Sequence, residues 1–137
     1  MIIMNEISWK YVKTLNNKDS IAIFEQVIGC EIPKDIKECV INYNGGRPSK
    51  KIFDTNLSQE RVIKSLLSYN TTDLETVFDA YSILSKENKK LVPVASDPGG
   101  NYICFDKDTK DILLWLHETN NIEKIADSFT EFLNKLR

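Results

Sequence analysis

The stretch from residue 91 to residue 118, LVPVASDPGGNYICFDKDTKDILLWLHE, constrains the fold more than any other part of the chain. It contains three short runs of apolar, β-branched and aromatic residues, which are typical of strands. Two turn sequences separate these runs, DPGG at 97–100 and DKDTKD at 106–111. Proline presets φ at the second turn position, and glycine accepts the positive φ that a type II turn needs at the third. We therefore expect three consecutive strands here, at the centre of the protein.

The second turn also predicts how the last two strands pair. If it centres on Asp108 and Thr109, the strands run antiparallel and His117 lies near Gly100. This register pairs Asp106 with Asp111, Cys104 with Leu113, and Tyr102 with Trp115. In the first strand, Pro93 has no N–H to donate, which favours an edge strand or a bulge at that point.

Both faces of the expected sheet are apolar, because side chains alternate between the faces along a strand. The two sets are Ile103, Phe105, Ile112, Leu114 and Leu116 on one face, and Tyr102, Cys104, Leu113 and Trp115 on the other. Such a sheet is either covered on both sides or exposes an aromatic patch on one. Burial on both sides is the simpler interpretation. The alternative is a partner-binding patch formed by Tyr102, Trp115 and His117.

Helical periodicity dominates the chain before this sheet. A first short helix is expected over residues 5–15, and a second over residues 20–28 that stops at Gly29. Pro33 suits the first position of a third helix. The NGG sequence at 44–46 ends that helix, because asparagine and glycine tolerate the left-handed conformation.

The segment between the third helix and the sheet is less regular. Residues 51–56 and 61–67 fit two strands of a hairpin, although 61–67 also fits a helical turn. Thr72 and Glu75 form a capping-box signature for a further helix. The expected apolar face of that helix comprises Leu74, Val77, Phe78, Tyr81 and Leu84.

One closing helix is expected after the sheet, with Asn120 or Asn121 as its N-cap. Its apolar stripe comprises Ile125, Phe129, Phe132, Leu133 and Leu136. These elements predict an α+β fold with a mainly antiparallel central sheet, packed by N-terminal and C-terminal helices. A length of 137 residues is that of one domain, which we expect to span residues 1–137.

The composition, with 42% hydrophobic and 28% charged residues, is that of a soluble globular protein. A formal net charge of −2 argues against direct nucleic-acid binding, which needs a basic surface. Cys30, Cys39 and Cys104 lack metal-ligand spacing and are expected to be buried free thiols in a reducing compartment. No signal-peptide pattern or membrane-spanning run is present, so we expect a cytoplasmic protein with no membrane partner.

No residue pattern indicates catalysis, and we expect no metal and no cofactor. His117 is the only histidine, which excludes a multi-histidine metal site. The predicted register places it roughly 13 Å from Cys104, at the usual strand rise, which is too far for a Cys–His nucleophile pair. The acidic run 106–111 fails as a calcium loop, because Lys110 stands at a ligand position.

Four segments, taken in order, resemble one family. They are IAIFEQVIGCEIPKDIKECVINYNGGRP at 21–48, LVPVASDPGGNYICFD at 91–106, LLWLHE at 113–118 and ADSFTEFLNKL at 126–136. Their joint pattern resembles the SUKH superfamily, which includes bacterial immunity proteins and the globular module of fungal cell-wall-synthesis regulators. The residues that match the family pattern are Glu25, Pro33, Asn44, Gly45, Gly46, Asp97, Gly99, Gly100, Asn101 and Trp115. Turns, caps and core positions account for most of them.

The resemblance implies a non-enzymatic domain. Many bacterial members bind and neutralise a cognate polymorphic toxin, often a nuclease, so a protein toxin is the expected partner. Blocking would be steric and electrostatic, with acidic side chains facing a basic toxin. The candidate partner-binding residues, which cluster at one end or face of the inferred sheet, are Asp97, Tyr102, Trp115, His117 and Glu118.

Two other functions stay open. One is a regulatory protein-interaction or ligand-binding module of the same fold, with no toxin. The other is an enzyme, which would require a cleft with converging polar groups of perturbed pKa. The protein is expected to be a monomer, or a homodimer if the second face of the sheet is exposed.

Overall fold

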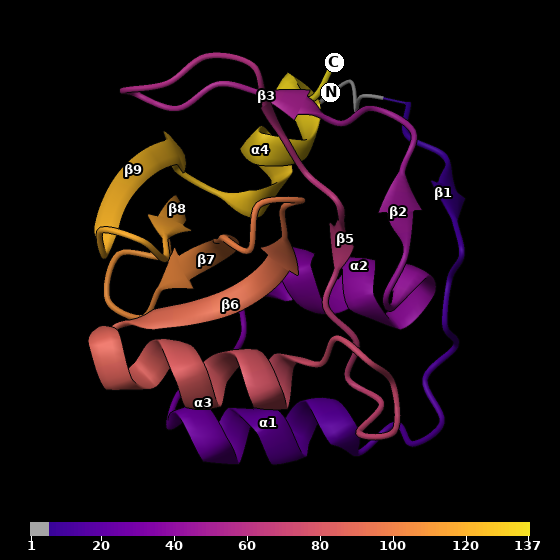
Figure 1. Cartoon of the computed structure of the whole chain (residues 1–137). Coiled ribbons are helices and arrows are strands. Elements are labelled where there is room, and N and C mark those ends of the chain that lie inside the picture. The colour runs from indigo at the N-terminus through magenta and orange to yellow at the C-terminus, as the bar shows by residue number, and fades with distance from the viewer. Residues whose placement is uncertain (1–5) are drawn as a thin grey trace.

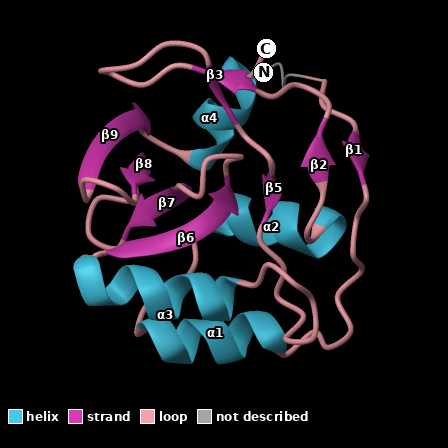
Figure 2. Ribbon diagram, in the orientation of Figure 1, coloured by secondary structure: helices cyan, strands magenta, loops and turns pink. Residues whose placement is uncertain are grey.

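The structure is a computed structural model that describes residues 6–137. Figure 2 shows the helices and strands of this part of the chain, and Figure 1 labels them. The helices are α1 (Ser20–Ile28), α2 (Lys34–Tyr43), α3 (Val77–Glu87) and α4 (Phe129–Lys135). The strands are β1 (Trp9–Lys10), β2 (Arg47–Pro48), β3 (Ile52–Phe53), β4 (Arg61–Val62), β5 (Ser65–Leu66), β6 (Leu91–Ser96), β7 (Tyr102–Asp106), β8 (Ile112–Leu116) and β9 (Asn121–Ala126). The predicted α+β class is confirmed.

Five strands form the central sheet in the order β5-β6-β7-β8-β9, and every neighbouring pair is antiparallel. The predicted register is confirmed, since Tyr102 pairs with Trp115 and Cys104 with Leu113. β6 lies between two strands, so the edge position considered for Pro93 is wrong. The bulge is confirmed, because the β6–β7 register shifts directly after this proline, which has no N–H for the ladder.

The end of the chain differs from the expectation of one long closing helix. Residues 121–126 form the edge strand β9, and α4 begins only at Phe129. Asn120 is therefore no helix cap; it has φ +59° in the turn between β8 and β9. Ser128 is the N-cap of α4, and its Oγ accepts a hydrogen bond from the backbone N–H three residues later at 3.1 Å. The spacing of Ile125 and Phe129 fits one helix as well as a strand followed by a helix, so periodicity alone misassigned it.

Helices α1 and α2 lie where the sequence predicts them. α1 buries Phe24 completely and ends at Gly29, which takes the left-handed φ of +76°. α2 begins directly after Pro33, and its buried residues are Ile36, Cys39 and Val40. At its end the left-handed conformation falls on Gly45, with φ +69°, while Asn44 keeps a negative φ.

Helix α3 begins later than the capping-box signature predicts. Thr76, and not Thr72, is the N-cap, and its Oγ1 accepts a hydrogen bond from the Asp79 backbone N–H at 3.1 Å. Leu74 therefore precedes the helix and is 97% exposed, where the sequence places it on the buried face. The other four predicted face residues, Val77, Phe78, Tyr81 and Leu84, are buried or partly buried.

The helix predicted over 5–15 is wrong for residues 6–15, while residue 5 lies outside the described residues. Trp9 and Lys10 form β1, which pairs antiparallel with β2. Tyr11 has φ +59°, which a right-handed helix cannot contain. A helix of this length has little stability on its own, so the contacts of Trp9 decide the conformation. Its ring stacks on Tyr43 of α2 with 5.1 Å between the ring centroids.

The hairpin expected between residues 51 and 67 forms from β3 and β4, which pair antiparallel. The alternative of a helical turn over 61–67 is wrong. The chain then leaves this hairpin, and β5 joins the central sheet beside β6, with Ser65 opposite Ser96.

Helices cover both faces of the central sheet (Figure 1). α3 runs along one face, and α1 packs against it. The rings of Phe24 and Phe78 meet edge-on there, with 5.2 Å between their centroids. Beneath α3, Leu84 clusters with Cys104 and Trp115, whose exposed fractions are 0% and 3%. The phenylalanines of α4 belong to the larger core, together with Ile103 and Phe105 from the opposite face of the sheet to Cys104. Burial on both sides is therefore the correct interpretation of the two apolar faces.

Candidate functional site

The turn between β6 and β7 is held by the carboxylate of Asp97. Its Oδ1 accepts hydrogen bonds from the backbone N–H groups of Gly99 at 2.9 Å and Asn101 at 2.7 Å, and its Oδ2 accepts one from Asn101 Nδ2 at 2.9 Å. An aspartate that bonds the backbone two residues on is a common device of tight turns. The positive φ falls on Gly100, at +86°, and not on Gly99 as a type II turn over 97–100 requires. The turn is thus confirmed, but its predicted geometry is shifted by one residue.

The predicted approach of His117 to this turn is confirmed. Its backbone N–H donates to Asn101 Oδ1 at 3.0 Å, and its ring Nε2 lies 3.0 Å from the carbonyl oxygen of Gly99. A carbonyl only accepts, so Nε2 carries the proton in this contact. A Cβ on Gly100 would lie 3.4 Å from the same ring nitrogen. The side chain of His117 is therefore engaged with the turn.

Trp115 does not lie on the surface. It is 3% exposed, and its indole Nε1 donates to Asn120 Oδ1 at 2.6 Å. Tyr102 stacks beside it with the ring planes 9° apart and 6.0 Å between the centroids. Tyr102 itself is half-buried, and this burial, together with the negative charge of Glu75, raises the pKa of its phenol. Of the two aromatic candidates, only Tyr102 has surface to offer a partner.

A hollow of about 360 Å³ lies where the 97–100 turn meets the start of α3. Its apolar lining includes Leu74, Ile83 and Tyr102. Leu74 is 97% exposed and Ile83 is 52% exposed, which is unusual for two large aliphatic side chains at one hollow. Sequence reasoning missed both, because the misplaced helix start put Leu74 in the core and left Ile83 without a role. We call this cavity, with its lining residues, the α3 hollow.

Carboxylates surround these apolar side chains. Asp97, Glu75 and Asp79 line the α3 hollow, with Lys64 as its single basic residue. Lys64 is neutralised by Glu75, with 2.7 Å between Nζ and Oε1. The structure gives the exposed side-chain carboxylate of Asp79 no hydrogen-bond or ion-pair partner among residues 6–137. The α3 hollow thus combines exposed apolar side chains with carboxylates, which suits a basic or amphipathic group of a partner.

The remaining candidates lie on the other side of the same turn. His117 and Glu118 line a separate hollow of about 250 Å³, together with Arg61. The structure therefore brings four of the five predicted partner-binding residues to one end of the sheet, in two adjoining hollows, with Trp115 packed behind them. The family-pattern residues Gly99, Gly100 and Asn101 build the turn between the two hollows.

The other family-pattern residues hold the core at a different place. Asn44 is 1% exposed; its Nδ2 donates to the Lys13 carbonyl oxygen and to Ser68 Oγ, and its Oδ1 accepts from the Tyr69 backbone N–H. Next to it, a Cβ on Gly46 would lie 2.8 Å from the Tyr43 carbonyl oxygen, so the chain passes too closely for a larger residue. Gly45 supplies the left-handed φ described above.

Glu25 ties α1 to the start of α2, just ahead of Pro33. Its carboxylate accepts a hydrogen bond from the Ile32 backbone N–H at 2.7 Å and pairs with Lys37 Nζ at 2.8 Å. Burial opposes ionisation of Glu25, but these two donors outweigh it and hold the pKa of the carboxyl below its usual value. This residue therefore has a structural role in the described fold.

The thiols offer no nucleophile near His117. All three cysteines are free; Cys39 and Cys104 are buried, whereas Cys30 is only partly buried. Burial raises the pKa of Cys39 to about 12 and that of Cys104 further still. Within residues 6–137, no three His, Cys, Asp or Glu side chains come together as metal ligands. No helix in that range is long and apolar enough to span a membrane.

The fold and the turn-centred site define an α+β module with helices on both faces of an antiparallel sheet and an acidic hollow at one sheet end. The chain belongs to the SUKH family: the family model SUKH_6, described as SMI1-KNR4 cell-wall, matches residues 18–133. The resemblance drawn from the sequence segments is thereby confirmed. The chain is also similar to the SPbeta prophage-derived uncharacterized protein YokK of Bacillus subtilis (strain 168). The two are 27% identical over 147 aligned positions, which cover 90% of this chain and 76% of that protein.

Proposed function

We propose that this chain is an immunity protein, which binds a cognate bacterial toxin and neutralises it without catalysing a reaction. The family to which the chain belongs supports this proposal, because immunity proteins are among the members of SUKH. The similarity to a prophage-derived protein agrees with it, since a mobile element is a suitable carrier for a toxin and its antidote.

The observation that carries the proposal is the α3 hollow. Hydrophobic anchors at the centre of an acidic surface match the usual anatomy of a tight protein interface, where a few buried apolar side chains supply most of the binding energy. Leu74 projects almost entirely into solvent beside the unpaired carboxylate of Asp79. We infer that the toxin covers Leu74 and Tyr102 and places a basic group near Asp79.

Neutralisation on this basis is steric. The immunity protein covers the catalytic cleft of the toxin or the groove that holds its substrate. A nuclease suits this mechanism, because its substrate groove is basic and would be attracted to the carboxylates of the hollow. Such attraction raises the association rate and makes it sensitive to salt.

A second candidate is a regulatory module of the same fold that binds a small ligand. The volume of the α3 hollow, about 360 Å³, favours this function, because small-molecule sites start at roughly 300 Å³. The ligand would be cationic with an apolar part, for the same reasons of lining and charge. It would bind without any toxin.

The experiment is a co-purification of the tagged protein with the product of the adjacent gene, followed by a toxicity-rescue assay in cells. Under the proposal the two proteins co-purify and the immunity protein restores growth. Leu74→Asp and Asp79→Lys should each weaken the complex about tenfold or more, as expected for residues at the centre of an interface.

Two matched controls separate this surface from general effects. Leu57→Asp makes the same change at a leucine that is 73% exposed in the β3–β4 loop. Glu87→Lys reverses an exposed charge at the far end of α3. Both should bind and rescue as the unmodified protein does. If no adjacent product binds and growth is not restored, the immunity function is wrong, and a screen of cationic ligands tests the regulatory module.

A further inference from the structure

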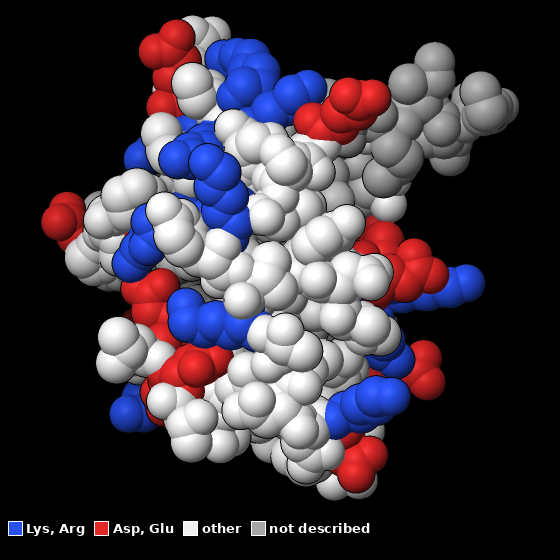
Figure 3. Space-filling view, turned by 90° about the vertical axis from the view of Figure 1, so that its right-hand side faces the viewer, with Lys and Arg blue, Asp and Glu red and all other residues white. Residues whose placement is uncertain are grey.

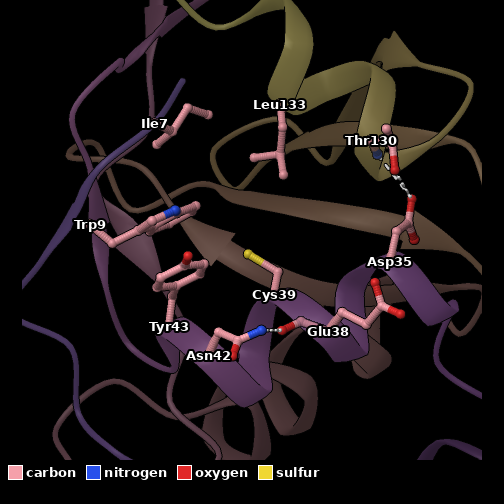
Figure 4. Close-up of a pocket in the computed structure, with 9 residues that line it drawn as sticks. All are labelled: Ile7, Trp9, Asp35, Glu38, Cys39, Asn42, Tyr43, Thr130 and Leu133. Atoms are coloured by element: carbon pink, nitrogen blue, oxygen red, sulfur yellow. Dashed lines mark hydrogen bonds between the residues drawn. The ribbon is translucent and has the colours of Figure 1, made fainter. Parts of the chain in front are cut away.

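A groove of about 260 Å³ lies between α2, α4 and the N-terminal strand β1, and it shares no residue with the α3 hollow. Figure 4 shows its lining. Cys39 of α2 lies at its centre, Trp9 and Tyr43 stand on one side, and Leu133 of α4 closes it from another. The groove therefore combines three segments that are far apart in the sequence.

One wall of the groove is an aromatic stack. The rings of Trp9 and Tyr43 lie 5.1 Å apart between centroids with their planes 11° from parallel. Gly46 lies close against this stack, since a Cβ there would lie 3.3 Å from Trp9 Cε3. Tyr43, the last residue of α2, remains 38% exposed. The wall is thus aromatic, and Tyr43 leaves it open to a partner.

Among the described residues, the only charged side chains of this lining are carboxylates. Asp35 is already occupied, since its Oδ2 accepts from both the backbone N–H and the hydroxyl of Thr130, at 2.9 and 3.0 Å. Glu38 is available: its side chain is 64% exposed, and its ion pair with Lys34 spans 4.0 Å between exposed groups. No lysine, arginine or histidine lines the groove among the described residues.

The surroundings of the groove favour a protein partner. Figure 3 views the side of the molecule that carries β1 and β2; an uncharged area lies near its centre, and Lys and Arg side chains border it on one side. Exposed side chains with apolar surface in this region include Val12 at 38% and Tyr11 at 71%, and the guanidinium of Arg47 lies over the Tyr11 ring at 5.4 Å from its centroid. A surface with exposed aromatic and aliphatic side chains beside a groove is typical of a contact surface for another chain.

We propose that this groove binds one arginine side chain from an extended segment of a protein partner. The guanidinium is planar, so it lies against the aromatic wall while it donates to the carboxylate of Glu38. Its methylene stem packs on Leu133 and Cys39. A volume of about 260 Å³ holds one long side chain and excludes a helix, whose diameter is about 10 Å. The proposal is independent of the toxin contact at the α3 hollow.

The two tryptophans make the groove directly observable. The chain has Trp9 in the groove and Trp115 under α3, and these are its only tryptophans. In a ¹H–¹⁵N correlation spectrum each indole N–H gives its own signal. The probe is a capped five-residue peptide of glycine and serine with one central arginine. The matched control peptide carries citrulline, which keeps the planar shape and lacks the charge.

The expected result is a saturable shift of the Trp9 indole signal with the arginine peptide, while the Trp115 signal stays in place. The citrulline peptide should bind about tenfold more weakly, because a hydrogen bond to a charged group is lost. Glu38→Gln should weaken the arginine peptide by a similar factor. Glu87→Gln, the same change at an exposed position of α3, should have no effect.

Three results would overturn the proposal. They are no saturable shift of the Trp9 signal up to about 10 mM peptide, equal binding of the two peptides, and unchanged binding by the Glu38→Gln variant. Because the toxin contact is tested with Leu74 and Asp79, which do not line the groove, failure of one proposal leaves the other standing.

Discussion

The ring Nε2 of His117 and the carbonyl oxygen of Gly99 lie 3.0 Å apart, which joins the end of β8 to the turn between β6 and β7. Asn101 reinforces this junction by accepting a hydrogen bond from the backbone N–H of His117 at 3.0 Å. The strands β6 and β8, which lie on either side of β7, are thus connected at one end of the sheet. The geometry of the two adjoining hollows depends on this tie.

The first prediction concerns Gly100, which supports the junction. Gly100→Ala should destabilise the protein by about 1–2 kcal/mol, because φ is +86° and the new Cβ meets the His117 ring at 3.4 Å. The measurement is the free energy of unfolding from urea titration. Gly99→Ala is the control, and it should cost less because Gly99 has no positive φ. Equal losses for the two variants would contradict this view of the turn.

The second prediction concerns the hydrogen bonds of the buried Asn44 side chain. Asn44→Ala should destabilise by about 2–4 kcal/mol, since the backbone groups of Lys13 and Tyr69 lose their partner inside the protein. Asn42→Ala is the matched change, because Asn42 is exposed and bonds only the carbonyl oxygen one helical turn before it. That control should stay within about 0.5 kcal/mol of the unmodified protein. Thermal and urea unfolding measure both.

Trp115 should behave as a core residue. Trp115→Ala should cost about 3–5 kcal/mol in the free energy of unfolding, as large-to-small changes in a core do. Trp115→Phe keeps most of the packing and loses the hydrogen bond to Asn120. If it folds, it should bind any partner with unchanged affinity. A folded Trp115→Phe protein with strongly weakened binding would show that this side chain contacts the partner after all.

Glu25 should make the stability depend on acid pH. Its pKa is lowered from the ordinary 4.5 in the folded state, so the ionised carboxylate stabilises the fold above about pH 4.5. That contribution is lost as the pH falls through the lowered value. Glu25→Gln should therefore be less stable at pH 7, and the difference from the unmodified protein should shrink toward pH 3. Urea unfolding at a series of pH values measures it; a constant difference would refute it.

The thiols should differ in reactivity. Cys30 is only partly buried, whereas Cys39 is 8% exposed with its pKa raised to about 12 and Cys104 is fully buried. Because the thiolate is the reactive form, one thiol per chain should react rapidly with a disulfide reagent under native conditions. All three should react in denaturant. A Cys30→Ser variant should lose the rapid phase, and its persistence would show local opening around another cysteine.

The central strands illustrate what local pattern can determine. Side chains alternate with a period of two, and a turn of known length sets which residues face each other, so the pairing of Tyr102 with Trp115 follows from the sequence. The contact of His117 with the 97–100 turn follows from the same register. Helix α1 is equally local, because its apolar spacing and the glycine after it specify both ends.

The candidate site was only partly within reach of the sequence. The strand register by itself places three of the candidates at one end of the sheet: Asp97, Tyr102 and His117. The exposure of Leu74 depends on whether the chain caps α3 at Thr72 or at Thr76, and both choices satisfy the local rules. The burial of Trp115 depends on the position of α3, which no pattern within β8 reveals.

The sequence by itself determined the class of fold, the register of β7 and β8, and the family. Tertiary structure decided β1, a two-residue strand that gains its hydrogen bonds from β2 far along the chain, and it decided that residues 121–126 form β9 beside β8 and not the start of a helix. It also decided the stack of Trp9 on Tyr43, which joins residues 34 positions apart and creates the groove. Alternation and capping act over a few residues, whereas burial depends on which distant segment arrives to cover a side chain.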